Sequence, residues 1–276
     1  MQQGVRSLVR QTPLEQYRGY LLGWRQNKLS TFERYLHDLR FLEQASGKPF
    51  LSDTVSVRLD HHDVMAAVIA NPDKAPETQA CIVKAAKSWE KAGEQLGWWK
   101  ANGLLNLSFP KPKPELKPSL TDRQVQALLG VCRTAREWRV VALGLYAGMR
   151  VSDSTALRER DWHEDRIRYT ARKTGNKVEV PIHLELAGLK RVICNDYPEG
   201  EVLKMTARRL RDRVDFYFTT NTLRATFTQR LLDLGVPLWV VKDLRGDAPK
   251  EVVFTNYAVV PFPDKQGAIS TLDYGA

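Results

Sequence analysis

A proline-rich run near the middle of the chain sets the strongest limit on how it can fold. In the stretch NLSFPKPKPELKPSL, proline occupies every second position from 110 to 114, and also position 118. Proline fixes φ and has no backbone N–H, so this stretch cannot form a regular helix and favours an extended, stiff connector. We therefore expect a linker at residues 109–118, which would separate a first domain, residues 1–108, from a second, residues 119–276.

The residues before the linker show apolar side chains at helical spacing. In the segment 30–47, Ser30 or Thr31 is expected to cap the start of a helix and Gly47 to end it. Similar patterns occur at residues 14–26, 61–71 and 76–99. Short helices of this kind predict a compact helical domain.

The residues after the linker combine helices with one hairpin. Helical spacing recurs over residues 121–135, 137–148, 204–218 and the first part of 220–257. Between these helices, IRYTARKTGNKVEVPIHL alternates on both sides of the turn-forming cluster Thr174-Gly175-Asn176. The sequence therefore predicts a mainly α fold with a small antiparallel β-sheet in the second domain, an α+β class.

The charge balance indicates a polyanionic partner. The chain carries 42 Lys and Arg against 32 Asp and Glu, a net charge of +10, and basic side chains at phosphates release condensed counterions. Basic residues gather in the linker, at Lys111, Lys113 and Lys117, and in one predicted helix, at Arg208, Arg209, Arg211 and Arg213. Each group is either a solvated surface or a set of phosphate contacts, so all seven are candidate DNA-binding residues.

Other features narrow the class of protein. The apolar and charged fractions, 43% and 27%, are those of a folded globular protein, and no uncharged apolar run is long enough to cross a membrane. The N-terminus has no apolar signal core, and the three cysteines are widely spaced. We therefore expect no membrane contact, no disulfide framework, and a cytoplasmic, nucleoid-associated location.

Four residues in three separated segments suggest a shared chemistry. Arg150 lies in AGMRVSDSTAL, Lys173 in ARKTGNKVEVPI, and both Arg224 and Tyr257 in the stretch that begins TNTLR. Each has an ordinary explanation when taken singly; Arg150 could cap helix carbonyls or pair with Asp153. Together they supply two guanidiniums, an amine and a phenol, the groups needed to attack a phosphodiester without a metal.

In these segments the chain resembles the tyrosine recombinases, the phage-integrase family of site-specific DNA recombinases. AGMRVSDSTAL is similar to the family's first arginine box, with Arg150 as the arginine and Asp153 as its supporting acid. RKTGNKVEVPI is similar to the hairpin lysine segment, NTLRATFTQRLL to the His-x-x-Arg box, and FTNYA to the segment with the nucleophile. The resemblance therefore places Lys173, Arg224 and Tyr257 in the catalytic set, and it extends over the helical region and the linker.

Two positions depart from the family pattern. Asn221 takes the place of the His in the His-x-x-Arg box, and its amide can hydrogen-bond a phosphate oxygen but cannot transfer a proton. Asp247 stands where a His or Trp is usual, with one extra residue before Tyr257. An ionised carboxylate would repel a phosphate, so Asp247 is expected either to face away or to pair with a basic neighbour such as Arg245. Both residues remain candidate catalytic positions.

The resemblance implies a reaction that needs no cofactor. Two arginines would hold the non-bridging oxygens, Tyr257 would form a 3′-phosphotyrosyl intermediate, and Lys173 would act as general acid on the leaving 5′-oxygen. No acidic cluster has metal-ligand spacing, so no metal site is expected. Four protomers would act on two double-stranded DNA sites through a Holliday junction, and accessory DNA-bending proteins could assist. Viral genome integration, excision and chromosome-dimer resolution are roles of this kind.

Two other classes of protein are compatible with the same residues. A type IB topoisomerase would use the same chemistry to relax supercoils, although the short chain and compact helical first domain favour the recombinase. A DNA-binding protein on a recombinase scaffold would no longer cleave, and Asn221 and Asp247 favour that reading. The C-terminal segment AVVPFPDKQGAISTLDYGA is expected to dock either on a neighbouring protomer or on its own chain.

Overall fold

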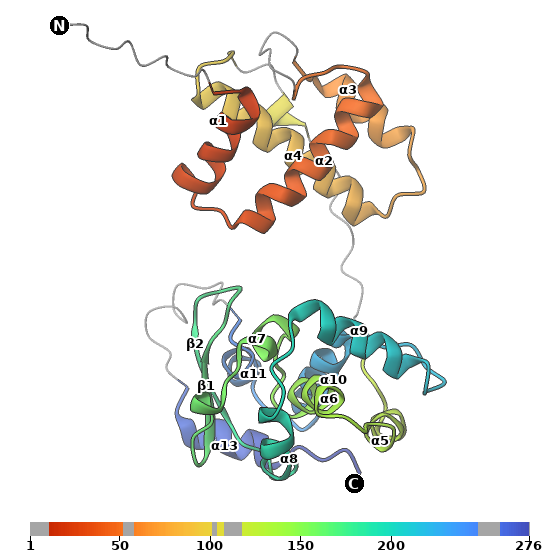
Figure 1. The fold of residues 1–276 in the computed structure, drawn as a ribbon, viewed down its shortest axis with the longest axis vertical. Helices are drawn as coiled ribbons and strands as arrows, with labels where there is room; N and C mark the ends of the chain where they lie inside the picture. The colour runs from red at the N-terminus through yellow and green to blue at the C-terminus, as the bar shows by residue number, and fades with distance from the viewer. Residues whose placement is uncertain (1–10, 52–57, 101–103, 108–117, 248–259, 276) are drawn as a thin grey trace, which may run out of the picture. The chain divides into compact units, whose positions relative to one another are not determined.

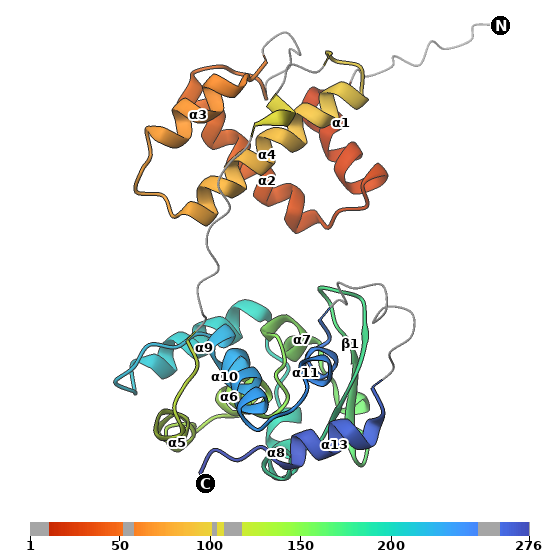
Figure 2. The same ribbon diagram turned by 180° about the vertical axis from the view of Figure 1, so that it is seen from behind.

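The computed structural model describes residues 11–51, 58–100, 104–107, 118–247 and 260–275. The chain divides between residues 115 and 116 into two compact units. Figures 1 and 2 show the elements of both units from opposite sides. Among the described helices, none combines the length and the apolar character needed to cross a membrane.

The first unit is built from helices. Its elements are α1 (Pro13–Gly19), the π-helical turn η1 (Tyr20–Trp24), α2 (Leu29–Ser46), α3 (His61–Ile69), α4 (Pro76–Gln95) and the 3₁₀ turn η2 (Leu104–Asn106). α2 packs against both α3 and α4. It ends at Gly47, which adopts a φ of 67° as a helix C-cap, but it begins after Lys28. The expected cap at Ser30 or Thr31 is therefore wrong.

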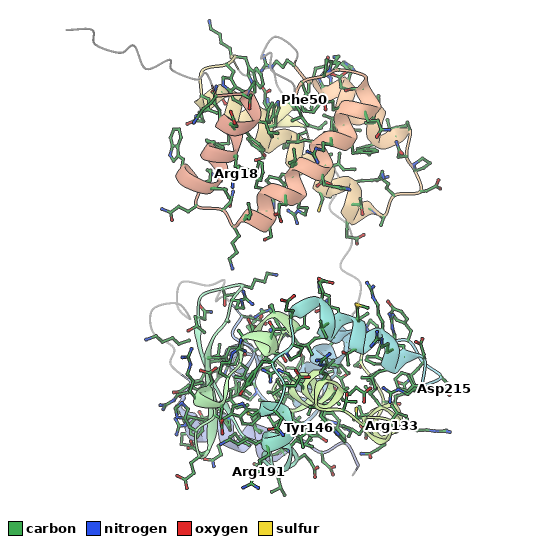
Figure 3. All side chains as sticks on the ribbon, viewed as in Figure 1. Arg18, Phe50, Arg133, Tyr146, Arg191 and Asp215 are labelled. Carbon is green, nitrogen blue, oxygen red and sulfur yellow. The ribbon has the colours of Figure 1, made fainter. Side chains whose placement is uncertain are left out.

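Aromatic rings fill the core of the first unit. Trp89 of α4 is buried and lies edge-on to Tyr17 and Phe50, with ring centroids 5.0 and 5.8 Å away. Trp98 follows at 5.2 Å. Figure 3 shows Phe50 inside this unit. Because large rings bury the most apolar area per residue, these contacts between α1, α4 and the chain after α2 hold the helices together.

The second unit is organised around one buried helix. Its elements are α5 (Asp122–Gly130), α6 (Ala135–Tyr146), α7 (Val151–Ala156), η3 (Glu159–Asp161), β1 (Arg166–Thr170), β2 (Lys177–Pro181), α8 (Leu184–Cys194), α9 (Gly200–Arg211), α10 (Thr220–Asp233), α11 (Leu238–Leu244) and α13 (Phe262–Ser270). α6 packs against α8, α9 and α10, and every residue from Val140 to Tyr146 is buried. A helix that is apolar on all sides needs partners on all sides.

Close packing between α6 and α10 depends on a glycine. A Cβ added at Gly144 would lie 2.7 Å from the Cβ of Leu223, so a larger residue would push the two helices apart. Since α10 carries Arg224 and α6 leads into Arg150, this contact sets the distance between the two segments that hold the candidate arginines.

The predicted hairpin is present. β1 and β2 pair antiparallel, with Tyr169 opposite Val178 and Thr170 opposite Lys177. The connection is closed by a 2.8 Å hydrogen bond from Ala171 N to Asn176 O, and Gly175 inside it adopts a φ of 78°. The predicted fold class, mainly α with a small antiparallel sheet, is confirmed.

Two helices of the second unit, α7 and α8, were not apparent from the sequence. α7 and α8 flank the hairpin, and the helix expected at residues 204–218 is instead α9, which starts at Gly200 and ends at Arg211. α7 has only six residues, too few for a periodic pattern to be visible.

The C-terminal segment, where described, packs on its own unit. α13 lies against β2 and α11, and Lys265 pairs with Asp243 at 2.5 Å. Beyond α13, the hydroxyl of Tyr274 donates to the carbonyl of Leu145 at 2.8 Å, and Gln126 donates to the carbonyl of Tyr274 at 2.9 Å. The sequence left open docking on the same chain or on a neighbouring protomer. Residues 260–275 dock on their own chain.

Candidate active site

The two candidate arginines are brought together by tight packing at the end of α6. Arg150 is the N-cap residue of α7, and Arg224 is buried one turn into α10. Between α6 and α7, Gly148 adopts a φ of 55°, and a Cβ there would overlap the ring of Phe227. Arg224 Nη1 donates to the carbonyl of Gly148. The glycine of the first arginine box therefore allows the close approach that fixes the second arginine.

Both arginines converge on Asp247. Its Oδ1 accepts a hydrogen bond from Arg150 Nη2 and another, at 2.8 Å, from Arg224 Nη2. The carbonyl of Arg245 lies between the same side chains, 3.0 Å from Arg224 Nη2 and 3.4 Å from Arg150 Nη1. Arg245 also approaches the carboxylate, with its Nε 3.2 Å from Oδ2. One carboxylate thus holds three guanidiniums in one cluster, which we call the arginine cluster: Arg150, Arg224 and Arg245 around Asp247.

The sequence allowed two arrangements for Asp247, and it adopts the paired one. It pairs with Arg245, as expected for a basic neighbour, and also with the two candidate catalytic arginines. The charge explains the arrangement: three guanidiniums close together repel one another unless an anion lies among them.

The hairpin turn fixes the backbone that carries Asp247. Gly246 has a φ of 60°, and a Cβ there would overlap Val178 of β2. Thr174 Oγ1 donates to the carbonyl of Gly246 at 3.0 Å, and Asn176 Nδ2 donates to the carbonyl of Asp247 at 3.2 Å. Lys173 precedes Thr174 in this turn and is exposed. The turn that carries the candidate general acid therefore lies directly against residues 246–247.

Asp153, the expected supporting acid, links the first arginine box to the hairpin. It is buried, its Oδ1 accepts from the backbone N of Arg172 at 2.8 Å, and its Oδ2 lies 3.8 Å from Arg150 Nη1. It therefore connects α7 to the chain immediately before Lys173.

Burial and like charge shape the electrostatics of the arginine cluster. Burial, together with Arg245 and Arg150, lowers the pKa of Arg224 to about 10, so its guanidinium stays protonated at neutral pH. Burial also lowers the pKa of Arg245, and Asp247 opposes that shift. The cluster thus holds positive charge in partly buried surroundings, where charge attracts an anion more strongly than at a fully exposed surface.

A tyrosine beside the arginine cluster was not singled out from the sequence. The hydroxyl of Tyr169 on β1 is buried and has no hydrogen-bond partner among the described residues. Burial and the charge of Asp153 raise its pKa, while Arg224 and Arg150 oppose the shift. Its position in an alternating strand was the available signal, because every second residue of such a strand faces inward.

Other candidate residues, catalytic and DNA-binding, differ in whether the structure describes them. Asn221 is described: it lies in the first turn of α10, one turn before Arg224, and is exposed. No hydrogen bond joins its side chain to the arginine cluster within the described part of the chain. Tyr257 and the linker lysines Lys111, Lys113 and Lys117 lie outside the described residues.

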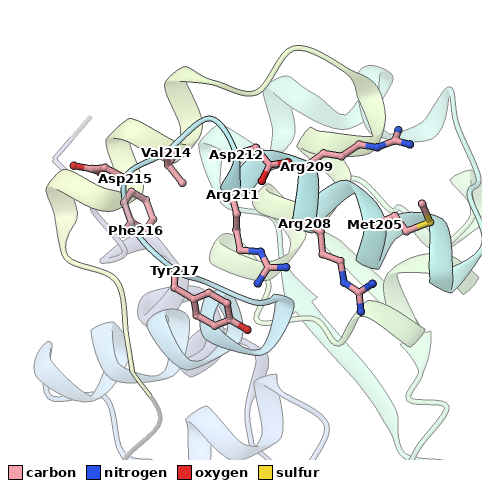
Figure 4. Close-up of a pocket in the computed structure, with 9 residues that line it drawn as sticks. All are labelled: Met205, Arg208, Arg209, Arg211, Asp212, Val214, Asp215, Phe216 and Tyr217. Carbon is pink, nitrogen blue, oxygen red and sulfur yellow. The ribbon is translucent and has the colours of Figure 1, made fainter.

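The basic helix predicted near residue 208 forms part of a pocket in the second unit. The pocket has a volume of about 660 Å³ and lies at the end of α9. Figure 4 shows Arg208 and Arg211 pointing to the same side as Tyr217, whereas Arg209 points away from them. The guanidinium of Arg211 lies 4.7 Å from the ring centroid of Tyr217, which is 73% exposed. This exposed cation–aromatic pair is a surface on which a phosphate or a base can lie.

Arg213, the fourth arginine of that group, is bonded to other residues of the second unit. It donates to the carbonyl of Val131 at 2.8 Å and pairs with the buried carboxylate of Glu137. Glu137 also accepts from the backbone N of Arg133 and Thr134 and so caps α6. The guanidinium of Arg213 is therefore engaged by contacts within the second unit.

No grouping of three His, Cys, Asp or Glu side chains suited to a metal ion occurs within the described residues. The arginine cluster instead has the composition of an anion site.

Comparisons with known proteins give matches only among solved structures. No protein-family model matches the chain, and neither does any curated protein. A lambda integrase (residues 75–356) dimer bound to a COC′ core site is 15% identical, with a TM-score of 0.70 over 86% of this chain and 91% of that one. The Tn1549 transposon integrase (residues 82–397) in complex with circular intermediate DNA is 16% identical, with a TM-score of 0.62 over 94% and 99%.

A third structure, the integrase from mycobacterium phage Brujita, is 16% identical, with a TM-score of 0.53 over 95% of this chain and 93% of that one. At such identities the likeness concerns the fold. The resemblance that the sequence motifs suggested is confirmed at that level: this chain has the fold of phage and transposon integrases.

Proposed function

We propose that the protein is a site-specific DNA recombinase that cuts and rejoins DNA through a 3′-phosphotyrosyl intermediate. The observation that carries the proposal is the convergence of Arg150 and Arg224, 74 positions apart in the sequence, on one anion within an integrase fold. Attack on a phosphodiester adds negative charge to the non-bridging oxygens, and two guanidiniums that converge on one anion can hold these oxygens.

Tyr257 is the proposed nucleophile. A phosphotyrosyl ester conserves the energy of the broken bond, so a 5′-hydroxyl of another strand can reverse the step. Tyr274, the nearest tyrosine downstream, is a poor substitute, because it is buried and its hydroxyl is bonded to the carbonyl of Leu145. Burial also raises its pKa, which disfavours the phenolate.

Lys173 is the proposed general acid. The leaving 5′-oxygen needs a proton, and neither Asn221 nor an ionised Asp247 can donate one in the way a histidine does. Lys173 lies in an exposed turn that is held against residues 246–247. An exposed position beside the arginine cluster suits a group that must reach into bound DNA.

Duplex DNA is the proposed partner. Arg208, Arg211 and Tyr217 form one basic surface, and the linker lysines would form another. By analogy with the integrases it resembles, the chain would act as a tetramer on two DNA sites, through a Holliday junction, in the cytoplasm and on the nucleoid. Residues 1–108 would form a helical DNA-binding domain, residues 109–118 would link the domains, and accessory DNA-bending proteins could assist.

A covalent-capture experiment separates this proposal from its rivals. The protein is incubated in EDTA with randomised duplexes that carry a nick. After cleavage the short fragment with the free 5′-hydroxyl diffuses away, which traps any 3′-adduct. Recovery of detergent-resistant protein–DNA complexes with a common sequence would support the recombinase. Relaxation of supercoiled plasmids without a preferred site would favour a type IB topoisomerase. Sequence-specific binding with no covalent product would indicate a recombinase scaffold that no longer cleaves.

A further inference from the structure

The space between the two candidate catalytic arginines is already filled by a side chain of the protein. Asp247 Oδ1 accepts from both Arg150 Nη2 and Arg224 Nη2. These are donors that a phosphodiester would need, and a carboxylate oxygen satisfies a guanidinium in the same way as a phosphate oxygen does. In this arrangement the phosphate and the carboxylate compete for the same hydrogen bonds.

The backbone of Asp247 is held in this place from several directions. Gly246 has a left-handed conformation and lies against Val178, so a residue with a Cβ would not fit at this position. The carbonyls of Gly246 and Asp247 are both bound by the hairpin turn, and Asp247 N donates to the carbonyl of Lys242 at 3.0 Å. The backbone position of Asp247 is therefore fixed by the fold of this turn.

The side chain of Asp247, unlike its backbone, is free to move toward solvent. Asp247 is 26% exposed, so its carboxylate borders on solvent, unlike the nearly enclosed guanidinium of Arg224 at 6%. Arg245 contacts the other carboxylate oxygen through Nε at 3.2 Å. A rotation of the side chain can thus release Arg150 and Arg224 while the carboxylate stays close to the guanidinium of Arg245.

We propose that Asp247 is an internal anion that closes the arginine site in the DNA-free protein and is displaced by the incoming phosphodiester. The inference rests on the proposed function in one respect, the assignment of Arg150 and Arg224 as the groups that hold the scissile phosphate. It goes further in assigning Asp247 an autoinhibitory role: isolated phosphates compete poorly with it, whereas DNA that binds over a large surface can displace it.

The test uses inorganic phosphate, which needs no DNA site and no cleavage. Phosphate binding to the full-length chain is measured by calorimetry at constant ionic strength, with chloride as the balancing anion. Asp247→Asn keeps the size of the side chain but removes its charge, so it should bind phosphate about tenfold or more tightly than the unaltered protein, because two charge-assisted donors become accessible. Asp243→Asn is the matched control: it makes the same change of charge four positions earlier, at a carboxylate that pairs with Lys265.

Two further variants make the result decisive. The double variant Arg150→Ala/Asp247→Asn should lose the gain in phosphate affinity, which shows that the anion binds between the arginines. If Asp247→Asn does not fold, Asp247→Ser is measured in its place. Phosphate affinity in the Asp247 variant equal to or weaker than in the unaltered protein would overturn the proposal, since Asp247 would then only hold the arginines in position. Tighter phosphate binding without any covalent DNA product would leave the anion site standing and reject the recombinase.

Discussion

Thr174 Oγ1 donates a 3.0 Å hydrogen bond to the carbonyl of Gly246, across 72 positions of sequence. This bond joins the hairpin turn that carries Lys173 to the turn that carries Asp247. The proposed general acid and the arginine cluster are therefore supported by one contact surface, which Gly246 makes possible by approaching Val178 closely.

Gly246→Ala is expected to damage this surface. The alanine would adopt an unfavourable positive φ, at a cost of about 1–2 kcal/mol, and would overlap Val178, which adds about 1–3 kcal/mol. Gly175→Ala is the control, because Gly175 has a similar φ of 78° but nothing within 4 Å of an added Cβ. Chemical denaturation should show a clearly larger loss in the free energy of unfolding for Gly246→Ala than for Gly175→Ala. Equal losses in the two variants would show that the contact with Val178 contributes nothing.

Two tyrosines with buried hydroxyls, Tyr274 and Tyr169, should respond differently to removal of the hydroxyl. Tyr274→Phe loses the hydrogen bond to Leu145 and leaves that carbonyl without it, which costs about 1–3 kcal/mol. Tyr169→Phe removes a buried hydroxyl without a partner among the described residues, so the free energy of unfolding should stay the same or rise. Thermal unfolding of the two variants checks this, and a loss of stability in Tyr169→Phe would reveal a partner for its hydroxyl.

Glu137 should make stability depend on pH. Burial acts to raise its pKa, but hydrogen bonds from Arg133 N, Thr134 N and Arg213 together lower the pKa below the ordinary value of 4.5. A lowered folded-state pKa means that the carboxylate stabilises the fold above pH 4.5 and that this contribution is lost as pH falls through the folded-state pKa.

Glu137→Gln should therefore be less stable than the unaltered protein near neutral pH, and the difference should shrink as the solution is acidified. Glu201→Gln, at an exposed carboxylate that pairs with Lys204, should change little. A difference for Glu137→Gln that is constant with pH would show that hydrogen-bond geometry, and not ionisation, is responsible.

The sequence predicted the fold class and the segments of the site because their signals are local. Arg150 and Arg224 were identifiable from short motifs, and both lie in the arginine cluster. The conformation of Asp247 was not decided by the sequence, because it depends on Arg150, which is 97 positions away. Arg245 was considered only as a neighbour of Asp247, yet its carbonyl also lies between the two candidate arginines.

The docking of the C-terminal segment could not be predicted from the sequence for the same reason. Its contacts with α11, β2 and the end of α6 join residues far apart in the sequence. The sequence of the segment alone therefore could not distinguish docking in cis from docking in trans. In the same way, Arg213 belonged to a basic run by composition, and its pairing with Glu137 is visible only in three dimensions.

Lys173 can be tested as the general acid with a modified substrate. An alkoxide leaves poorly without a proton, so Lys173→Ala should slow cleavage by about 10²–10⁴-fold. Replacement of the scissile 5′-oxygen by sulphur should restore the rate, because a thiol has a pKa of about 8.5 and its thiolate departs unaided.

Arg150→Ala should not be rescued in this way, since its proposed role concerns the non-bridging oxygens, which the sulphur leaves unchanged. Lys177→Ala, an exposed lysine four positions further along the hairpin, serves as the control and should cleave normally. Rescue of an Asp247 variant in place of Lys173→Ala would assign the proton to a protonated carboxyl group at Asp247.

The identity of the covalently bonded residue tests the central claim most directly. Complexes trapped on the nicked substrate are digested with protease and nuclease, and the peptide that retains a nucleotide is sequenced by mass spectrometry. The account predicts a 3′-phosphodiester on Tyr257, no adduct in Tyr257→Phe despite near-normal DNA binding, and an adduct that persists in Tyr274→Phe. A nucleotide on any other residue, or an undiminished adduct in Tyr257→Phe, would contradict it.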